Sequence, residues 1–127
     1  MNGTLCFVIH GMPVISKNRR PIFRGKSGKP FIGKSRQLRD WQQSAVAQLK
    51  AQWGDRPPIE GPVNAKIVTY RAKRQSGDAS GWYQAPEDAL EAAGILKNDH
   101  QIESHDGSRR DRDWENPRVE IELRGLP

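Results

Sequence analysis

Two acidic turns flank one short predicted helix in the middle of the chain, and this unit constrains the fold more than any other feature. Between residues 74 and 109 the pattern indicates a strand end, a polar turn, a helix, a second turn and a departing strand. The first turn carries Asp78, the second carries Asp99, and Gly94 closes the helix between them. We expect this strand–helix–strand unit to return Asp99 towards Asp78. Acidic side chains at both of its turns predict a metal site that faces a phosphate backbone.

The spacing alone also fits simpler interpretations. Mg²⁺ or Mn²⁺ prefers hard oxygen ligands, and Asp78, Asp99 and Asp106 are the candidate ligands. Aspartate is also common in turns and at helix N-caps, so Asp78 is alternatively a cap and Asn98–Asp99 an ordinary turn. Asp88 is a further carboxylate within reach, although it equally suits the positive N-terminal end of the helix dipole.

Other catalytic arrangements around the second turn are excluded by residue type or by geometry. His100 and His105 have no cysteine nearby, so a zinc site is not expected. Ser104, His105 and Asp106 are consecutive in a predicted strand, where neighbouring side chains point to opposite faces and cannot form a hydrogen-bonded triad.

The charge of the chain is distributed unevenly. The 127 residues fit one domain, 1–127, with a formal net charge of +6. Residues 1–50 hold ten Lys or Arg and a single acid, Asp40. This asymmetry predicts a surface that binds nucleic acid, the alternative being that surface cations only keep a small protein soluble. The candidate phosphate contacts are Lys17, Arg19, Arg20, Arg74, Lys97 and Arg109.

Two further features bear on the compartment. The chain has no apolar run long enough to span a membrane and no signal-peptide layout at its N-terminus. It contains one cysteine, Cys6, which cannot form an internal disulfide. We therefore expect a cytoplasmic protein.

Hydrophobic periodicity predicts the order of the elements. Strands are expected at 5–9, 63–72, 102–106 and 118–124, a small hairpin at 22–32, and helices at 35–53 and up to 93. The run 5–9 is almost wholly apolar and is predicted as a central strand, whereas the charged run 109–113 is predicted as a loop. Pro86 predicts that the second helix starts late or has a loose first turn. This order predicts an α+β domain, a mixed sheet with two main helices packed mostly on one face.

Several short motifs occur in a particular order along the chain. They are Gly11-Met12-Pro13 followed by basic residues, Asp78-Ala79-Ser80-Gly81, Asp88-Ala89-Leu90, Gly94, Asn98-Asp99-His100-Gln101-Ile102, and Glu115-Asn116-Pro117-Arg118-Val119-Glu120-Ile121. In this order and spacing the chain resembles the RusA family of Holliday-junction resolvases, small dimeric endonucleases of DNA recombination and repair that prophages often carry. The resemblance covers nearly the whole chain.

The resemblance implies a RusA-like fold and a homodimer that acts on four-way or branched DNA. It further implies Mg²⁺ (or Mn²⁺) as the cofactor, paired phosphodiester hydrolysis, and Asp78 and Asp99 as catalytic metal ligands. The chain departs from the family pattern at three positions. Ser80 replaces a second aspartate, Gly81 replaces an asparagine, and Gln84 stands where the family has a helix lysine.

Two explanations of these departures are open. In the first, the chain is a divergent, active branch that uses Asp106 or Asp88 as the replacement carboxylate and Lys97 or Arg109 as the replacement cation. In the second, it is a catalytically impaired, non-enzymatic nucleic-acid-binding protein on the same fold. We expect the active enzyme, because acidic side chains are plentiful near the second turn.

Overall fold

The structure is a computed structural model that describes residues 3–14, 22–24, 30–32, 36–72 and 82–127. For residues 22–24 and 30–32 it describes the backbone only.

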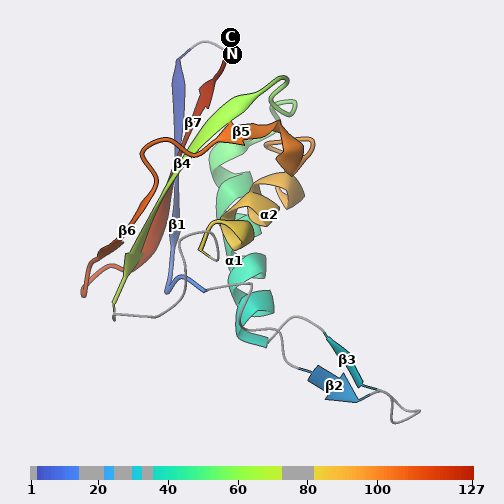
Figure 1. Cartoon of the computed structure of the whole chain (residues 1–127), viewed down its shortest axis with the longest axis vertical. Helices are drawn as coiled ribbons and strands as arrows, with labels where there is room; N and C mark the ends of the chain where they lie inside the picture. The colour runs from blue at the N-terminus through green and yellow to red at the C-terminus, as the bar shows by residue number, and fades with distance from the viewer. Residues whose placement is uncertain (1–2, 15–21, 25–29, 33–35, 73–81) are drawn as a thin grey trace.

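A mixed sheet of five strands forms one layer of the fold (Figure 1). The strands are β1 (Thr4–His10), β4 (Val63–Arg71), β5 (Ile102–Ser104), β6 (Arg109–Arg112) and β7 (Arg118–Gly125). Strand β7 lies between β1 and β4 and is antiparallel to both. Strands β5 and β6 both run parallel to β4 on its other side. The sheet is therefore mixed, as predicted.

Two helices form the second layer, and Figure 1 shows both on the same side of the sheet. They are α1 (Arg36–Trp53) and α2 (Gln84–Ala92). A short 3₁₀ turn, η2 (Asp99–Gln101), precedes β5, and a separate hairpin pairs β2 (Ile22–Arg24) with β3 (Pro30–Ile32). The predicted α+β class with helices on one face and the predicted hairpin are confirmed.

The core lies between the sheet and the helices. Along β7 the side chains of Val119, Ile121 and Leu123 are almost fully buried, and Ile121 is paired with Phe7 on β1 and Ile67 on β4. The opposing stripe of α1 consists of Leu38, Trp41, Ala45, Leu49 and Trp53. Their spacing of three and four residues places them on one helix face. Each fully buried large apolar side chain contributes about 1.5–3 kcal/mol to folding.

The prediction that residues 5–9 form a central strand is wrong, because β1 lies at an edge of the sheet and, among the described strands, pairs only with β7. Two side-chain amides of α1 cover its outer backbone groups instead. Gln52 accepts from the Val8 amide at 3.0 Å and donates to the Val8 carbonyl at 2.8 Å. Gln48 does the same at His10, with distances of 2.7 and 3.0 Å. The apolar run reflects packing against α1 rather than a strand neighbour on each side.

The prediction of a loop at residues 109–113 is also wrong, because Arg109–Arg112 forms β6 beside the second half of β4. All four side chains of β6 are exposed. A strand that is wet on both faces has no alternation of apolar and polar residues, so periodicity cannot detect it. Its stability comes from the backbone hydrogen bonds to β4.

Helix α2 accommodates Pro86 without losing a backbone hydrogen bond. The helix begins two residues earlier, at Gln84, so Pro86 occupies a position in the first turn where the amide has no partner within the helix. Glu87 makes the first regular bond, to the Tyr83 carbonyl at 3.0 Å. Gly94, with φ of +78°, ends the helix as predicted. No helix in the described part of the chain is long and apolar enough to cross a membrane.

Candidate functional site

The described half of the predicted site lies around α2 and η2. Strand β5 is parallel to β4 and pairs with its first residues, so α2 carries the chain from the end of β4 back to its beginning. Asp99 is the first residue of η2, directly before β5. Residues 73–81 lie outside the described residues, and Asp78, Ser80 and Gly81 are among them. The predicted approach of Asp78 to Asp99 therefore stays a prediction.

The turn that carries Asp99 is held by its neighbours. The Asn98 side chain accepts from the His100 amide at 2.6 Å, and the Gln101 side chain accepts from the Asn98 amide at 3.2 Å. This reciprocal pair is a capping box. The Asp99 side chain itself is about one-third exposed and has His100 Nε2 at 3.7 Å. Among the described residues nothing donates a hydrogen bond to its carboxylate, which is thus presented by the backbone.

Glu87, in the first turn of α2, is the carboxylate that sequence reasoning missed. Its side chain is mostly buried and its Oε1 lies 2.5 Å from His105 Nε2. Burial raises the pKa of Glu87, the His105 contact opposes that shift, and the negative charges of Asp99 and Asp88 add to it. His105, Asp99 and Asp88 are therefore all close enough to act on Glu87. In the sequence Glu87 looks like an ordinary acid in the first turn of a helix, and its position beside Asp88 is the one feature that could have drawn attention to it.

His105 is fixed by a second contact. Its ring stacks on that of Tyr83, with centroids 5.3 Å apart and planes inclined by 16°. Tyr83 immediately precedes α2, and His105 immediately follows β5. Together with the bond to Glu87, this stack ties the end of β5 to the beginning of α2.

Gln84 and Asp88 satisfy each other on the same face of α2. Gln84 Nε2 donates to Asp88 Oδ1 at 2.8 Å, across one helical turn. Gln84 stands where the resemblance places a lysine. The amide thus supplies a neutral donor to a carboxylate at a point where a lysine would supply a positive charge.

Lys97 lies two residues before Asp99, just ahead of η2. Its Nζ is 2.5 Å from Glu60 Oε1, and both side chains are well exposed. This contact lowers the pKa of Glu60, chiefly through the hydrogen bond. Because both charges face solvent, the pair is worth little for stability. A phosphate group would compete with Glu60 for the same ammonium.

Asp106 lies in the turn between β5 and β6, and its side chain is exposed. Its backbone bridges a gap in the sheet: the Asp106 amide donates to Asn64 Oδ1 at 2.8 Å, and the Asn64 amide group donates back to the Asp106 carbonyl at 3.2 Å. Asp106 is not among the described charges that act on Glu87. Its predicted role as a ligand stays a prediction. Arg109 begins β6, with its Nε 3.6 Å from Asp111 Oδ2.

The donor set suits a hard divalent cation in chemistry, since carboxylate oxygens predominate around Asp99. Within the described residues, however, no three acidic, histidine or cysteine side chains are grouped closely enough to hold a metal ion. A complete site therefore needs at least one ligand from elsewhere, and Asp78 is the candidate that the sequence offers.

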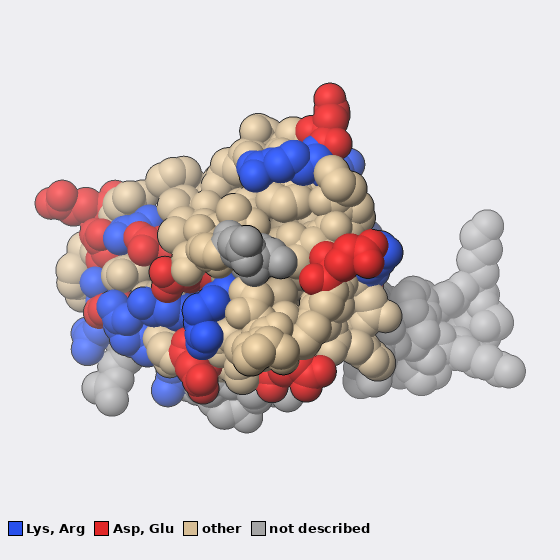
Figure 2. All heavy atoms as spheres, turned by 90° about the horizontal axis from the view of Figure 1, so that it is seen from above, with Lys and Arg blue, Asp and Glu red and all other residues tan. Residues whose placement is uncertain are grey.

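The charged surface is mixed rather than uniformly basic. Figure 2 shows basic side chains gathered on the side of the molecule where Figure 1 shows the sheet, with acidic side chains among them. The exposed arginines of β6, Arg109, Arg110 and Arg112, belong to the described basic residues. The predicted contacts Lys17, Arg19, Arg20 and Arg74 lie outside the described residues.

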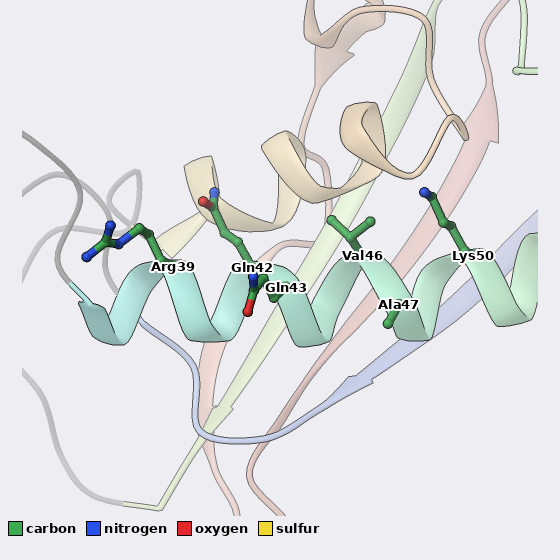
Figure 3. Close-up of a pocket in the computed structure, with 6 residues that line it drawn as sticks. All are labelled: Arg39, Gln42, Gln43, Val46, Ala47 and Lys50. Atoms are coloured by element: carbon green, nitrogen blue, oxygen red, sulfur yellow. The ribbon is translucent and has the colours of Figure 1, made fainter.

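Helix α1 carries a separate, shallow hollow on its outer side (Figure 3). The hollow has a volume of about 540 Å³ and is lined by Arg39, Gln42, Gln43, Val46, Ala47 and Lys50. In Figure 3 the side chains of Arg39, Val46 and Lys50 project from the helix side nearer α2, whereas Ala47 points the other way. All of its lining residues belong to α1 and none comes from α2 or η2, so this hollow is separate from the Asp99 turn.

Comparison with known proteins decides between the families that such a site allows. Residues 11–124 match the family model described as endodeoxyribonuclease RusA. The chain is also 30% identical over 92 residues to the crossover junction endodeoxyribonuclease RusA of Aquifex aeolicus (strain VF5), covering 72% of this chain and 68% of the relative.

The chain belongs to the RusA family.

The predicted resemblance is thereby confirmed. The RusA match begins after β1 and extends over β4, β5, β6 and nearly all of β7, both helices and both acidic turns, including the stretch with Asp78 that lies outside the described residues. Membership makes this chain one of a family of endodeoxyribonucleases. The roles of individual side chains follow only as proposals.

Proposed function

We propose that this RusA-family chain is a divalent-metal-dependent endodeoxyribonuclease that resolves Holliday junctions and other branched DNA. One observation carries the proposal: the RusA match spans both acidic turns, and the second of them presents the partly exposed carboxylate of Asp99. A partly exposed carboxylate is the kind of hard oxygen ligand that Mg²⁺ or Mn²⁺ binds. The named relative, which acts at crossover junctions, supports the same substrate.

The residues divide into ligands and substrate contacts. We assign Mg²⁺ or Mn²⁺ to Asp78 and Asp99, with Asp106 as a third ligand and Asp88 in support. Such an ion, when bound, activates water and stabilises the leaving oxygen of a phosphodiester. The basic side chains hold the DNA backbone and orient the scissile phosphate. They are Lys17, Arg19, Arg20, Arg74, Lys97 and Arg109.

Paired cleavage of a four-way junction needs two active sites with opposite orientation. A two-fold homodimer supplies them by symmetry, since each copy presents the same surface to one of two opposed strands. We therefore propose that the active form is a homodimer. Sedimentation velocity with and without junction DNA tests this assembly.

The decisive experiment uses a labelled four-way junction with Mg²⁺, with Mn²⁺ or with a chelator. The expected result is symmetric cleavage that requires the metal and falls at least a hundredfold in Asp99→Asn, because the amide cannot replace a carboxylate ligand. Asp55→Asn, in an exposed turn after α1, is the matched control and should cleave normally. Junction binding without cleavage under every divalent ion would instead identify a non-enzymatic nucleic-acid-binding protein.

A further inference from the structure

The side chain of Gln101 makes four hydrogen bonds, all to backbone groups. Its Oε1 accepts from the amides of Lys97 at 2.8 Å and Asn98 at 3.2 Å. Its Nε2 donates to the carbonyls of Ile59 at 2.8 Å and Gly61 at 3.0 Å. A glutamine amide has two acceptor lone pairs and two N–H donors. Every one of them is used here.

These four bonds join two segments that are far apart in the sequence. One segment leads from α2 into η2 and carries Asp99, and the other enters β4. The two segments already touch, because the Ile59 amide donates to the Ile95 carbonyl at 2.8 Å and Ile59 pairs with Leu96. The Gln101 side chain extends this contact to Asn98, the residue directly before Asp99.

The position of the Asp99 carboxylate depends on this arrangement. No described donor forms a hydrogen bond to that carboxylate, and the His100 ring, whose Nε2 lies 3.7 Å away, is highly exposed. Its direction is therefore set by the backbone of residues 98–101. Within that stretch the side-chain Oε1 of Gln101 accepts from the backbone amide of Asn98. The backbone amide of Gln101 donates to the backbone carbonyl of Asn98 at 3.2 Å. The glutamine thus brackets Asp99 from both sides and anchors it to the start of β4.

We propose that Gln101 is a positioning residue for the nuclease reaction, which fixes the Asp99 carboxylate for metal binding through the backbone of its turn. This inference rests on the proposed function. Gln101 does not touch the substrate in this assignment, and it acts only through Asp99. Loss of groups that orient a ligand typically weakens metal binding about tenfold or more.

The test compares Gln101→Met with Gln52→Met. Methionine has nearly the same shape as glutamine but forms none of these bonds. Gln52 also bonds through its amide to backbone groups, at Val8 and Gln48, but these lie on β1 and α1 rather than on η2 or at the start of β4. It therefore controls for a general loss of stability. Mn²⁺ binding is measured by electron paramagnetic resonance at 10 °C, and the Mg²⁺ concentration for half-maximal junction cleavage is measured in parallel.

The expected result is that Gln101→Met binds Mn²⁺ about tenfold more weakly and needs correspondingly more Mg²⁺, with junction binding in chelator unchanged. Gln52→Met should behave as the wild type in all three measurements. If Gln101→Met does not fold, Gln101→Glu replaces it, because a carboxylate keeps both acceptor contacts and loses only the two donor contacts that anchor the turn to Ile59 and Gly61. Its added negative charge would by itself strengthen cation binding, so weaker binding again supports lost positioning.

Two results overturn the inference, and they are distinguishable. In the first, the Gln101 variants cleave junctions and bind Mn²⁺ as the wild type does, or Gln52→Met is weakened as much as they are. Either outcome shows that Gln101 has only a structural role. A wild type that neither binds Mn²⁺ nor cleaves junctions shows that the proposed function itself fails.

Discussion

Glu87 shows how one side chain acquires its properties from its surroundings. Its pKa is raised by burial, and the negative charges of Asp99 and Asp88 act in the same direction, while His105 opposes them. A carboxyl whose pKa is higher in the folded than in the unfolded chain stabilises the fold below its unfolded value. That contribution is lost as the pH rises through the folded value. Glu87 therefore favours the folded state most in acid.

The corresponding prediction concerns Glu87→Gln in metal-free protein. The amide keeps a hydrogen-bonding partner for His105 but cannot ionise, so the loss of stability above about pH 4.5 that Glu87 causes should disappear. Melting temperatures measured between pH 4 and pH 8 in chelator should show the variant gaining on the wild type as the pH rises.

Glu91→Gln removes one negative charge from an exposed position of the same helix and serves as the control. A Glu87→Gln variant whose difference from the wild type is the same at every pH would contradict the raised pKa.

Residues of the site differ in how far the sequence could reveal them. Asp99 and Gln101 stand in a recognisable motif, and Asp99 lies in a turn as expected. The role of Glu87 could not be predicted, because its contact with His105 joins residues 18 positions apart on two elements. Asp106 looked like a ligand from its position, yet its backbone serves a purpose that only the sheet reveals, the pairing with Asn64.

At the scale of elements, α1 stabilises the sheet in two ways. One stripe of the helix buries Leu38, Ala45 and Leu49 in the core. A neighbouring stripe places Gln48 and Gln52, one turn apart, against the outer backbone of β1. An exposed strand edge would leave these amide and carbonyl groups to water, whereas here the helix binds them.

We predict that the double variant Gln48→Met, Gln52→Met is less stable than the wild type by about 1–3 kcal/mol, since each lost hydrogen bond is worth about 0.5–1.5 kcal/mol net and methionine regains part of that by packing. Urea unfolding followed by tryptophan fluorescence measures the difference. Gln43→Met, at an exposed position of the same helix, should change stability by less than about 0.5 kcal/mol.

The same element explains why sequence reasoning placed β1 wrongly. An apolar run predicts a strand whose two faces are both covered, and such strands usually lie in the interior of a sheet. Here the run packs on α1, and polar glutamines of a helix complete the strand's hydrogen bonds. No periodicity records such a contact between distant elements. By contrast, α1 and β7 were predictable, because their patterns reflect one buried face each.

At the scale of the whole molecule, the charge is divided between surfaces. Basic side chains gather beside the sheet with acids among them (Figure 2), whereas the hollow on α1 is lined by Arg39 and Lys50 without a described acid (Figure 3). Arg109 is predicted from the sequence to contact DNA. The face of α1 that carries Arg39 and Lys50 is instead predicted to be an ordinary solvated surface. The two assignments can be separated by the salt dependence of binding.

We predict that Arg109→Gln weakens junction binding and lowers the slope of log affinity against log salt by about 0.9, the value for one lost phosphate contact. Arg39→Gln removes the same charge from α1 and should leave the slope unchanged. Fluorescence anisotropy with a labelled junction in chelator, over a range of salt concentrations, gives both slopes. Equal slopes for the two variants would show that net charge alone, rather than the position of Arg109, determines binding.

The amides of Gln48 and Gln52 also limit how two copies can meet. Over Val8–His10 the backbone of β1 has no free groups left to template a strand from another molecule. A strand from another copy therefore cannot extend the sheet along this stretch of β1. A copy that docks over Val8–His10 has to do so through side chains, and its orientation then depends on their shape and charge.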